Sequence, residues 1–268
     1  MRSGAKSNLA GRVRPMRVCR ALSVAVFAVL LCAMHGSAQT KLTVSAAASL
    51  KDALADAETA YQHSHANVTF SNNFGPSGTL AIQIDQGAPV DIFLSAAAKP
   101  MDELIAKGLI AAATRRNLLR NSLVLIAPLD SQLKDFQGLA SSAIRVIALG
   151  DPGSVPAGQY GRQTLTALHL FDVLKSRLVF AKDVRQVLAY VESGNADAGL
   201  VYATDALTSN KVRVVATAPE STHDAIVYPV GVVKGRPSEA AARQFVEFLA
   251  TPAAQSIFQK HGFTIAAP

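Results

Sequence analysis

The sequence predicts an α/β protein in which mainly parallel sheets are covered by helices on both faces. The first observation is that short runs rich in β-branched residues alternate with longer segments of helical pattern, which is typical of βαβ units. The second is that half of the 268 residues are apolar, so the chain can bury the core of one large domain or of two lobes. No internal repeat, low-complexity tract or long charge run interrupts this pattern.

The elements follow one another in a regular order. The strand candidates are residues 42–45, 68–70, 90–94, 123–127, 145–149, 198–202, 212–216 and 226–233. The helix candidates lie between them, near residues 50–62, 78–86, 98–107, 157–169, 183–193 and 238–260. In sheets of this kind, ligands bind where the carboxyl ends of strands meet the starts of helices, so we expect the function in these loops.

Several of these loops place a helix start directly after a strand. Ser49 follows the first strand and is expected to cap a helix, with Asp52 at the spacing of a capping box. Ser77 stands at a second helix start, and the segments 150–158 and 182–184 open two more. A serine at one helix start is usually an ordinary cap. Several such helix starts together at the ends of strands indicate a binding role in addition to capping.

Helix N-termini carry partial positive charge and unpaired N–H donors, which makes them sites for anions. A pocket built from such donors would hold its anion without a cation and would favour a fully deprotonated ligand, because it offers a protonated oxygen no acceptor. Three carboxylates lie close by in sequence, those of Asp52, Asp151 and Asp183. We expect them to point away from the pocket or to cap their own helices.

The first 38 residues have the parts of a secretory signal peptide. Residues 1–20 carry six basic and no acidic residues, an apolar run of about 14 residues follows, and small residues at 36–38 form a cleavage site. The run is shorter than the ~20 residues that span a bilayer, so a retained anchor is the weaker alternative. Translation could start at Met1 or at Met16. Cys32 offers lipid anchoring as a minor alternative, although Leu31 is larger than such sites prefer.

Removal of residues 1–38 changes the composition. The whole chain has 26 basic and 19 acidic residues, but the remainder has 20 and 19, so its charge is no argument for a nucleic-acid or membrane partner. Both cysteines, Cys19 and Cys32, leave with the leader. The exported protein then has no disulfide, no thiolate metal site and no cysteine nucleophile.

Five segments in order resemble the periplasmic molybdate-binding proteins of ABC importers, and the likeness covers about residues 40–266. The segments are LTVSAAASL at 42–50, GAPVDIFLSA at 87–96, NSLVL at 121–125, GDP with VPAG at 150–158, and the stretch from Glu247 through the FTI at 263–265. The family fold has two α/β lobes, of the type II periplasmic-binding-protein kind, with the ligand in the cleft between them. The resemblance implies one lobe from residues 39–121 and 226–268 and a second from residues 122–225.

The resemblance also implies the ligand and its contacts. The expected ligand is molybdate or tungstate, held through its oxygens with no direct metal ligand and no cofactor. The serines that match the family are Ser49 and Ser77, the backbone N–H groups are those of Ala157 and Val184, and the tyrosine hydroxyl is that of Tyr202. The expected partner is an ABC permease, and the protein is expected to be a monomer in the periplasm that binds no nucleic acid.

One segment departs from the family. Many members carry a run of serines where this chain reads Gly75-Pro76-Ser77-Gly78, so fewer hydroxyls are available at this edge of the pocket.

The loop also lacks the final glycine of a G-x-S-x-G elbow, and the histidines show no metal-ligand spacing, so an enzyme is not expected. The alternative function is the same fold binding another oxyanion, such as sulfate. The sequence does not separate molybdate from tungstate.

Overall fold

The computed structural model describes residues 39–267. The expected signal peptide, both candidate start residues and Cys32 lie outside the described residues. Within the described part, no helix is both long and apolar enough to cross a membrane.

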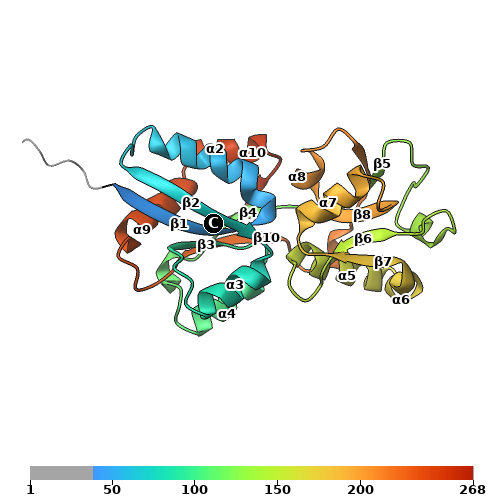
Figure 1. The fold of residues 1–268 in the computed structure, drawn as a ribbon, viewed down its shortest axis with the longest axis horizontal. Helices are drawn as coiled ribbons and strands as arrows, with labels where there is room; N and C mark the ends of the chain where they lie inside the picture. The colour runs from blue at the N-terminus through green and yellow to red at the C-terminus, as the bar shows by residue number, and fades with distance from the viewer. Residues whose placement is uncertain (1–38, 268) are drawn as a thin grey trace, which may run out of the picture. The chain divides into compact units, whose positions relative to one another are not determined.

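A six-stranded sheet organises the first lobe, which we define as this sheet and the helices packed on it (Figure 1). Its strand order is β11-β4-β10-β3-β1-β2. The strands are β1 (Thr40–Ala47), β2 (Val68–Gly75), β3 (Ile92–Leu94), β4 (Arg116–Arg120), β10 (Val227–Val232) and β11 (Thr264–Ile265). The helices are α2 (Lys51–Gln62), α3 (Ser77–Asp85), α4 (Ala98–Ala106), α9 (Glu239–Leu249) and α10 (Pro252–Lys260).

Both faces of this sheet are buried. Within β3, Ile92 and Leu94 belong to the large apolar core that includes α2, α9 and α10, whereas Phe93 points into a separate core with α3 and α4. Alternate residues of a strand point to opposite faces, so helices cover the sheet on both sides. The predicted layer arrangement is confirmed.

A five-stranded sheet organises the second lobe in the same way, with the order β7-β6-β8-β5-β9. The strands are β5 (Leu123–Pro128), β6 (Ile147–Gly150), β7 (Leu178–Ala181), β8 (Ala198–Tyr202) and β9 (Val212–Thr217). The helices are α5 (Pro156–Ala167), α6 (Phe171–Leu174), α7 (Val184–Glu192) and α8 (Ala203–Ala206). Short 3-10 helices lie at Ala48–Leu50, Ala112–Thr114, Gln137–Ala140, Lys175–Arg177 and Glu220–Thr222.

The sheets are mixed, which differs from the mainly parallel sheets that the sequence predicts. Strand β1 is parallel to β2 and β3, and β6 is parallel to β7 and β8, but every pair that involves β4, β5, β9 or β10 is antiparallel. Those four strands lead into or out of the two passages between the sheets. In each sheet, one of these strands carries the chain toward a passage and the other carries it away from one, so the two run in opposite directions.

The chain passes between the sheets twice. The first passage is at residues 121–122, after β4, and the second at residues 218–226, before β10. The two passages lie side by side, because the Asn121 N–H donates to the Ile226 carbonyl at 3.4 Å and the Ala218 N–H donates to the Leu123 carbonyl at 2.9 Å.

Most predicted helices and strands are present, but one predicted helix is divided into two. The expected helix 238–260 is two helices, because Pro252 cannot continue the ladder and Thr251 caps the new start by accepting from the Ala254 N–H at 3.4 Å. The sequence analysis missed β4, β7, β11, α6 and α8. These elements have two to five residues, too few to show a period.

Candidate functional site

All five residues predicted to bind the ligand line one small cavity between the lobes. The space that it encloses together with its mouth to solvent is about 220 Å³, and it is lined by Ala47, Ala48, Ser49, Gly75, Pro76, Ser77, Ala96, Val155, Pro156, Ala157, Asp183, Val184 and Tyr202. Each predicted residue is at most 4% exposed. The loops after β1, β2 and β3 of the first lobe meet the starts of α5 and α7 and the end of β8 of the second lobe there.

Ser49 does not cap a helix, so that part of the prediction is wrong. It lies inside the 3-10 helix Ala48–Leu50, and its Oγ lies 3.0 Å from the hydroxyl oxygen of Tyr228 on β10. Asp52, expected to complete a capping box, instead accepts from Arg185 at 2.7 Å. The Ser49 hydroxyl is therefore held by a tertiary contact at the wall of the cavity.

Ser77 also leaves its own helix uncapped. It is the first residue of α3, and its Oγ accepts a hydrogen bond from the backbone N–H of Ala96 at 2.9 Å. A backbone N–H can only donate, so the hydrogen of the Ser77 hydroxyl stays available for a second partner. Ser77 can thus donate into the cavity.

Ala157 and Val184 contribute backbone N–H groups at helix starts. Ala157 is the second residue of α5 and Val184 the first residue of α7, and N–H groups in the first turn of a helix have no acceptor within that helix. Helix α5 starts unusually close to β6, because a Cβ on Gly158 would lie 1.9 Å from the Gly150 carbonyl oxygen. Glycine at residue 158 is what lets the start of α5 reach the cavity.

Tyr202 ends β8 with its hydroxyl in the same region. Its oxygen lies 3.5 Å from the carbonyl oxygen of Ala96, and the hydroxyl of Tyr160 lies 3.5 Å from the same atom. Burial raises the pKa of Tyr202 well above its usual value, so this hydroxyl keeps its proton and can donate.

Sequence reasoning missed three residues around the cavity. Ala96, at the end of the GAPVDIFLSA segment, holds Ser77, and its place directly after a strand was the available signal. The sequence analysis assigned no role to Tyr160 or Tyr228, yet Tyr228 contacts Ser49. A lone buried tyrosine carries no signal in sequence that tells which hydroxyl it will meet.

The three nearby carboxylates behave as predicted. Asp183 caps α7 by accepting from the Gln186 N–H at 2.8 Å, and Asp151 accepts from the Gly153 N–H and the Ser154 hydroxyl, each at 3.0 Å. Asp52 pairs with Arg185. Each carboxylate thus has a protein partner, and of the three only Asp183 also lines the cavity.

The cavity presents neutral donors, and the one carboxylate in its lining, that of Asp183, accepts from the Gln186 N–H. Its lining contains no Lys, Arg or His. Among residues 39–267, no group of three or more His, Cys, Asp or Glu side chains could hold a metal ion. Two serine hydroxyls, a tyrosine hydroxyl and N–H groups at two helix starts suit a small anion that brings only acceptor oxygens.

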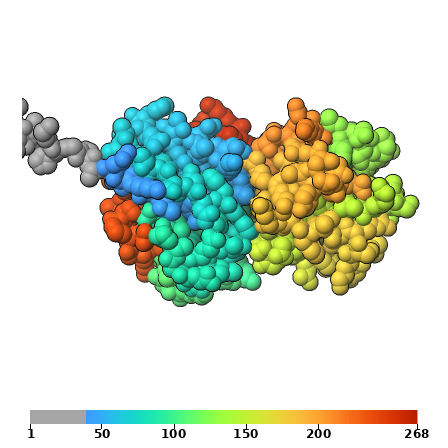
Figure 2. All heavy atoms as spheres, in the orientation of Figure 1, coloured from blue at the N-terminus to red at the C-terminus, as the bar shows by residue number. Residues whose placement is uncertain are grey.

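Contacts between the lobes close the cavity, and Figure 2 shows the two lobes meeting without a gap on the face in view. The Gly78 N–H donates to the Ser154 carbonyl across the boundary at 3.1 Å. A Cβ on Gly78 would lie 2.8 Å from that oxygen, so glycine is needed for the approach. Arg185 of α7 pairs both with Asp52 of the first lobe and with the fully buried Asp205 of its own lobe.

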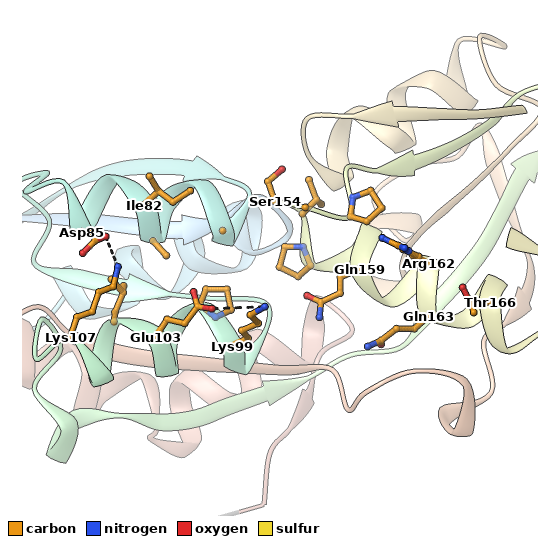
Figure 3. Close-up of a pocket in the computed structure, with 18 of the residues that line it drawn as sticks. Ile82, Asp85, Lys99, Glu103, Lys107, Ser154, Gln159, Arg162, Gln163 and Thr166 are labelled. Atoms are coloured by element: carbon orange, nitrogen blue, oxygen red, sulfur yellow. Dashed lines mark hydrogen bonds and ion pairs between the residues drawn. The ribbon is translucent and has the colours of Figure 1, made fainter. Parts of the chain in front are cut away.

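A larger pocket lies beside the small cavity, between α3 and α4 of the first lobe and α5 of the second (Figure 3). Charges of both signs line it, and Lys107 pairs there with Asp85 at 2.5 Å. Its charged groups are exposed and partly paired among themselves, unlike the buried donors of the small cavity.

Comparison with known proteins agrees with this geometry. Residues 42–264 match the family model for bacterial extracellular solute-binding proteins. The chain is 48% identical over 225 residues to YvgL of Bacillus subtilis (strain 168), covering 83% of this chain and 86% of the relative, whose name provisionally assigns it to the substrate-binding lipoproteins of ABC transporters. It is 42% identical over 247 residues to the molybdate-binding protein ModA of Escherichia coli (strain K12), covering 89% and 95% of the two chains.

A solved structure shares the fold. The periplasmic molybdate-binding protein of Azotobacter vinelandii superposes with a TM-score of 0.76 at 27% identity, covering 84% of this chain and all of the other. The match spans both lobes, and the relatives are covered almost from end to end. The chain therefore belongs to the family of bacterial extracellular solute-binding proteins and, within it, groups with relatives that include the molybdate-binding proteins ModA.

Proposed function

We propose that this protein binds molybdate, and tungstate as well, outside the cytoplasm and delivers it to the permease of an ABC importer. One observation carries the proposal: all five predicted ligand contacts, scattered over more than 150 residues of sequence, line a single closed cavity of neutral donors. The 42% identity to a protein named molybdate-binding supports the ligand class.

The donor set suits a fully deprotonated tetrahedral dianion. Each hydrogen bond to a charged acceptor contributes about 1.5–3 kcal/mol, so several together give high affinity without a cation. Release to a permease stays feasible because no buried ion pair has to be broken. Such a ligand is the protein's cargo, and no cofactor is required for the proposed role.

Selection against sulfate has to come from size. Molybdate, tungstate and sulfate have the same charge and shape, but the metal–oxygen bonds are longer than the sulfur–oxygen bonds. An anion too small for the cavity leaves buried donors unpaired at a cost of about 1–3 kcal/mol each. At the middle of this range, about 2 kcal/mol each, two unpaired donors would weaken sulfate binding by more than about a hundredfold.

The cellular setting follows the family. We propose that residues 1–38 direct export and are removed, that the mature protein is a periplasmic monomer, and that lipid attachment at Cys32 is the alternative. The family binds solutes, and the cavity shows no nucleophile–base pair, so no catalysis is proposed. A nucleic-acid partner is not part of the proposal, because residues 39–268 are nearly neutral.

Calorimetric titration of residues 39–268 with molybdate, tungstate and sulfate tests the proposal. Tight one-to-one binding of the first two anions, with sulfate at least a hundredfold weaker, is the expected result. Tight binding of sulfate, or of none of the three, would contradict the proposed ligand and leave the fold assignment intact.

A further inference from the structure

A chain of hydrogen bonds connects the Ser49 hydroxyl to the first passage between the lobes. Tyr228 on β10 lies with its hydroxyl oxygen 3.0 Å from Ser49 Oγ and 3.3 Å from Asn121 Nδ2. The same Nδ2 lies 2.9 Å from Oγ1 of Thr204 in the second lobe. Ser49, Tyr228 and Thr204 are each at most 3% exposed, so these contacts are shielded from competing water.

The direction of this chain is set at Asn121. The backbone N–H of Ser122 donates to Asn121 Oδ1 at 2.9 Å. A backbone N–H can only donate, so the atom that it meets must be the amide oxygen, and the other amide atom must be the NH₂ group. That NH₂ group can only donate. The Tyr228 oxygen therefore accepts from Asn121.

The hydrogen of the Tyr228 hydroxyl needs an acceptor. Among the described residues, Asn121 and Ser49 lie within hydrogen-bond distance of the Tyr228 hydroxyl, and Asn121 cannot accept there. The Tyr202 hydroxyl also faces Tyr228, but as a donor, because its hydrogen bond to Tyr228 raises the pKa of Tyr202. We infer that Asn121 and Tyr228 are positioning residues that act as a one-way relay, in which Tyr228 donates to Ser49 and so directs the Ser49 hydrogen into the ligand cavity. Burial raises the pKa of Tyr228 well above its usual value, so the relay keeps its hydrogen.

The relay has a consequence for ligand choice, and this consequence rests on the proposed function. With one lone pair taken by Tyr228 and its hydrogen directed inward, Ser49 offers a donor to the ligand. Ser77 is likewise left as a donor to the ligand, because its oxygen accepts from the Ala96 N–H. A ligand with a protonated oxygen, such as hydrogen phosphate, finds a donor where it needs an acceptor. The relay thus helps the site to prefer an anion with no proton.

The test is a set of calorimetric titrations with molybdate and with phosphate. The variants are Tyr228→Phe, Ser49→Ala and the double variant, compared with the wild-type protein. The matched control is Tyr61→Phe, because Tyr61 is equally buried in the first lobe but its hydroxyl has no hydrogen-bond partner among the described residues. A thermal unfolding curve for each variant shows whether it is folded.

We expect Tyr228→Phe to weaken molybdate binding about tenfold, as for one lost hydrogen bond, and Tyr61→Phe to leave it unchanged. In the Ser49→Ala background, Tyr228→Phe should add nothing, since the relay acts only through Ser49. The ratio of molybdate to phosphate affinity should fall in Tyr228→Phe, because the freed Ser49 hydroxyl can rotate and accept. A purely structural role for Tyr228 would not move that ratio.

Other results would overturn the relay. Unchanged molybdate affinity in folded Tyr228→Phe, or a loss that adds to that of Ser49→Ala, would show that Tyr228 does not act through Ser49. If the wild-type protein binds sulfate and not molybdate, the proposed ligand is wrong. The relay is then tested by titrating the same variants with sulfate, with the same results expected for Tyr228→Phe alone and in the Ser49→Ala background. Binding of no anion at all would overturn both.

Discussion

At the scale of single residues, the hydroxyl groups of the cavity are placed by contacts that their local sequence does not specify. Ser49 and Ser77 both stand at helix starts, where a serine ordinarily caps, and neither caps. Ser77 instead accepts from Ala96 and Ser49 contacts Tyr228, a residue 179 positions later. A cap would occupy the oxygen locally, whereas Ser77, which accepts from the Ala96 N–H, keeps its hydrogen for a further partner at the cavity.

Ser77→Ala tests this placement directly. The variant loses one charge-assisted hydrogen bond to the proposed dianion, so molybdate affinity should fall about 10- to 100-fold in a calorimetric titration. The exposed Ser193→Ala serves as control and should bind like the wild-type protein. Equal affinities for the two variants would remove Ser77 from the site.

A second residue-scale prediction concerns pH. Burial raises the pKa of Glu58 on α2 to about 7, while a hydrogen bond from Asn72 at 2.8 Å opposes the shift. The folded state therefore binds a proton that the unfolded state releases near its ordinary value of 4.5. The resulting stabilisation is complete below about pH 4.5 and is lost as the pH rises through about 7.

Denaturant unfolding at pH 5 and at pH 8 measures this effect. The wild-type protein should lose up to about 3 kcal/mol more than Glu58→Gln between the two pH values, since each pKa unit corresponds to about 1.4 kcal/mol. The exposed Glu247→Gln is the control and should follow the wild-type protein. Identical pH dependence in all three proteins would contradict the shift.

At the scale of elements, close approaches of backbone bring the helix starts to the cavity. Helix α5 begins against the end of β6, with no room for a side chain at residue 158. The VPAG segment therefore does two things: Pro156 starts the helix without an N–H, and Gly158 lets its first turn reach the strand. Ala157 lies between them and supplies the N–H group.

Gly158→Ala should disturb this start. The new methyl group would overlap the Gly150 carbonyl, so α5 must shift, lowering stability by about 1–3 kcal/mol and weakening molybdate binding as the Ala157 N–H moves. Gly153→Ala is the matched control in the same loop, because its Cβ would meet the Asp151 carboxylate at an ordinary 3.5 Å. Thermal unfolding and titration of both variants check this. Equal behaviour would contradict the steric argument.

At the scale of the whole molecule, few polar contacts join the lobes around the ligand cavity. Asp52 of α2 and Arg185 of α7 form an ion pair across the boundary, next to the Val184 N–H that faces the cavity. Asp52 is 45% exposed, so solvent screens the pair and its contribution to stability should stay below about 1 kcal/mol. Its effect should appear in how long the lobes stay closed.

Asp52→Asn removes that pair while Asp205 still holds Arg185. We expect molybdate to dissociate about two- to fivefold faster, as for a loss below about 1 kcal/mol, with little change in the unfolding midpoint. Stopped-flow measurement of release checks this. The control is Asp85→Asn, which breaks the pair with Lys107 inside the first lobe. Faster release from the control as well would mean that the effect is not specific to the lobe boundary.

The sequence by itself determined the fold class, most element positions and the candidate ligand contacts. Strand β8 has the predicted bounds, residues 198–202, and the five candidate ligand residues that the family resemblance implied lie at helix starts or at a strand end. These features depend on local periodicity and on motifs of a few residues, which can be identified from the sequence alone.

The contacts between residues far apart in sequence were decided only by the tertiary structure. The antiparallel strands at the passages, the contact of Ser49 with Tyr228 and the Asp52–Arg185 pair join residues that no local pattern relates. A hydroxyl or a carboxylate has several partners of similar energy available to it. Packing of the two lobes chooses among them, so the partners could be read only once the chain was folded.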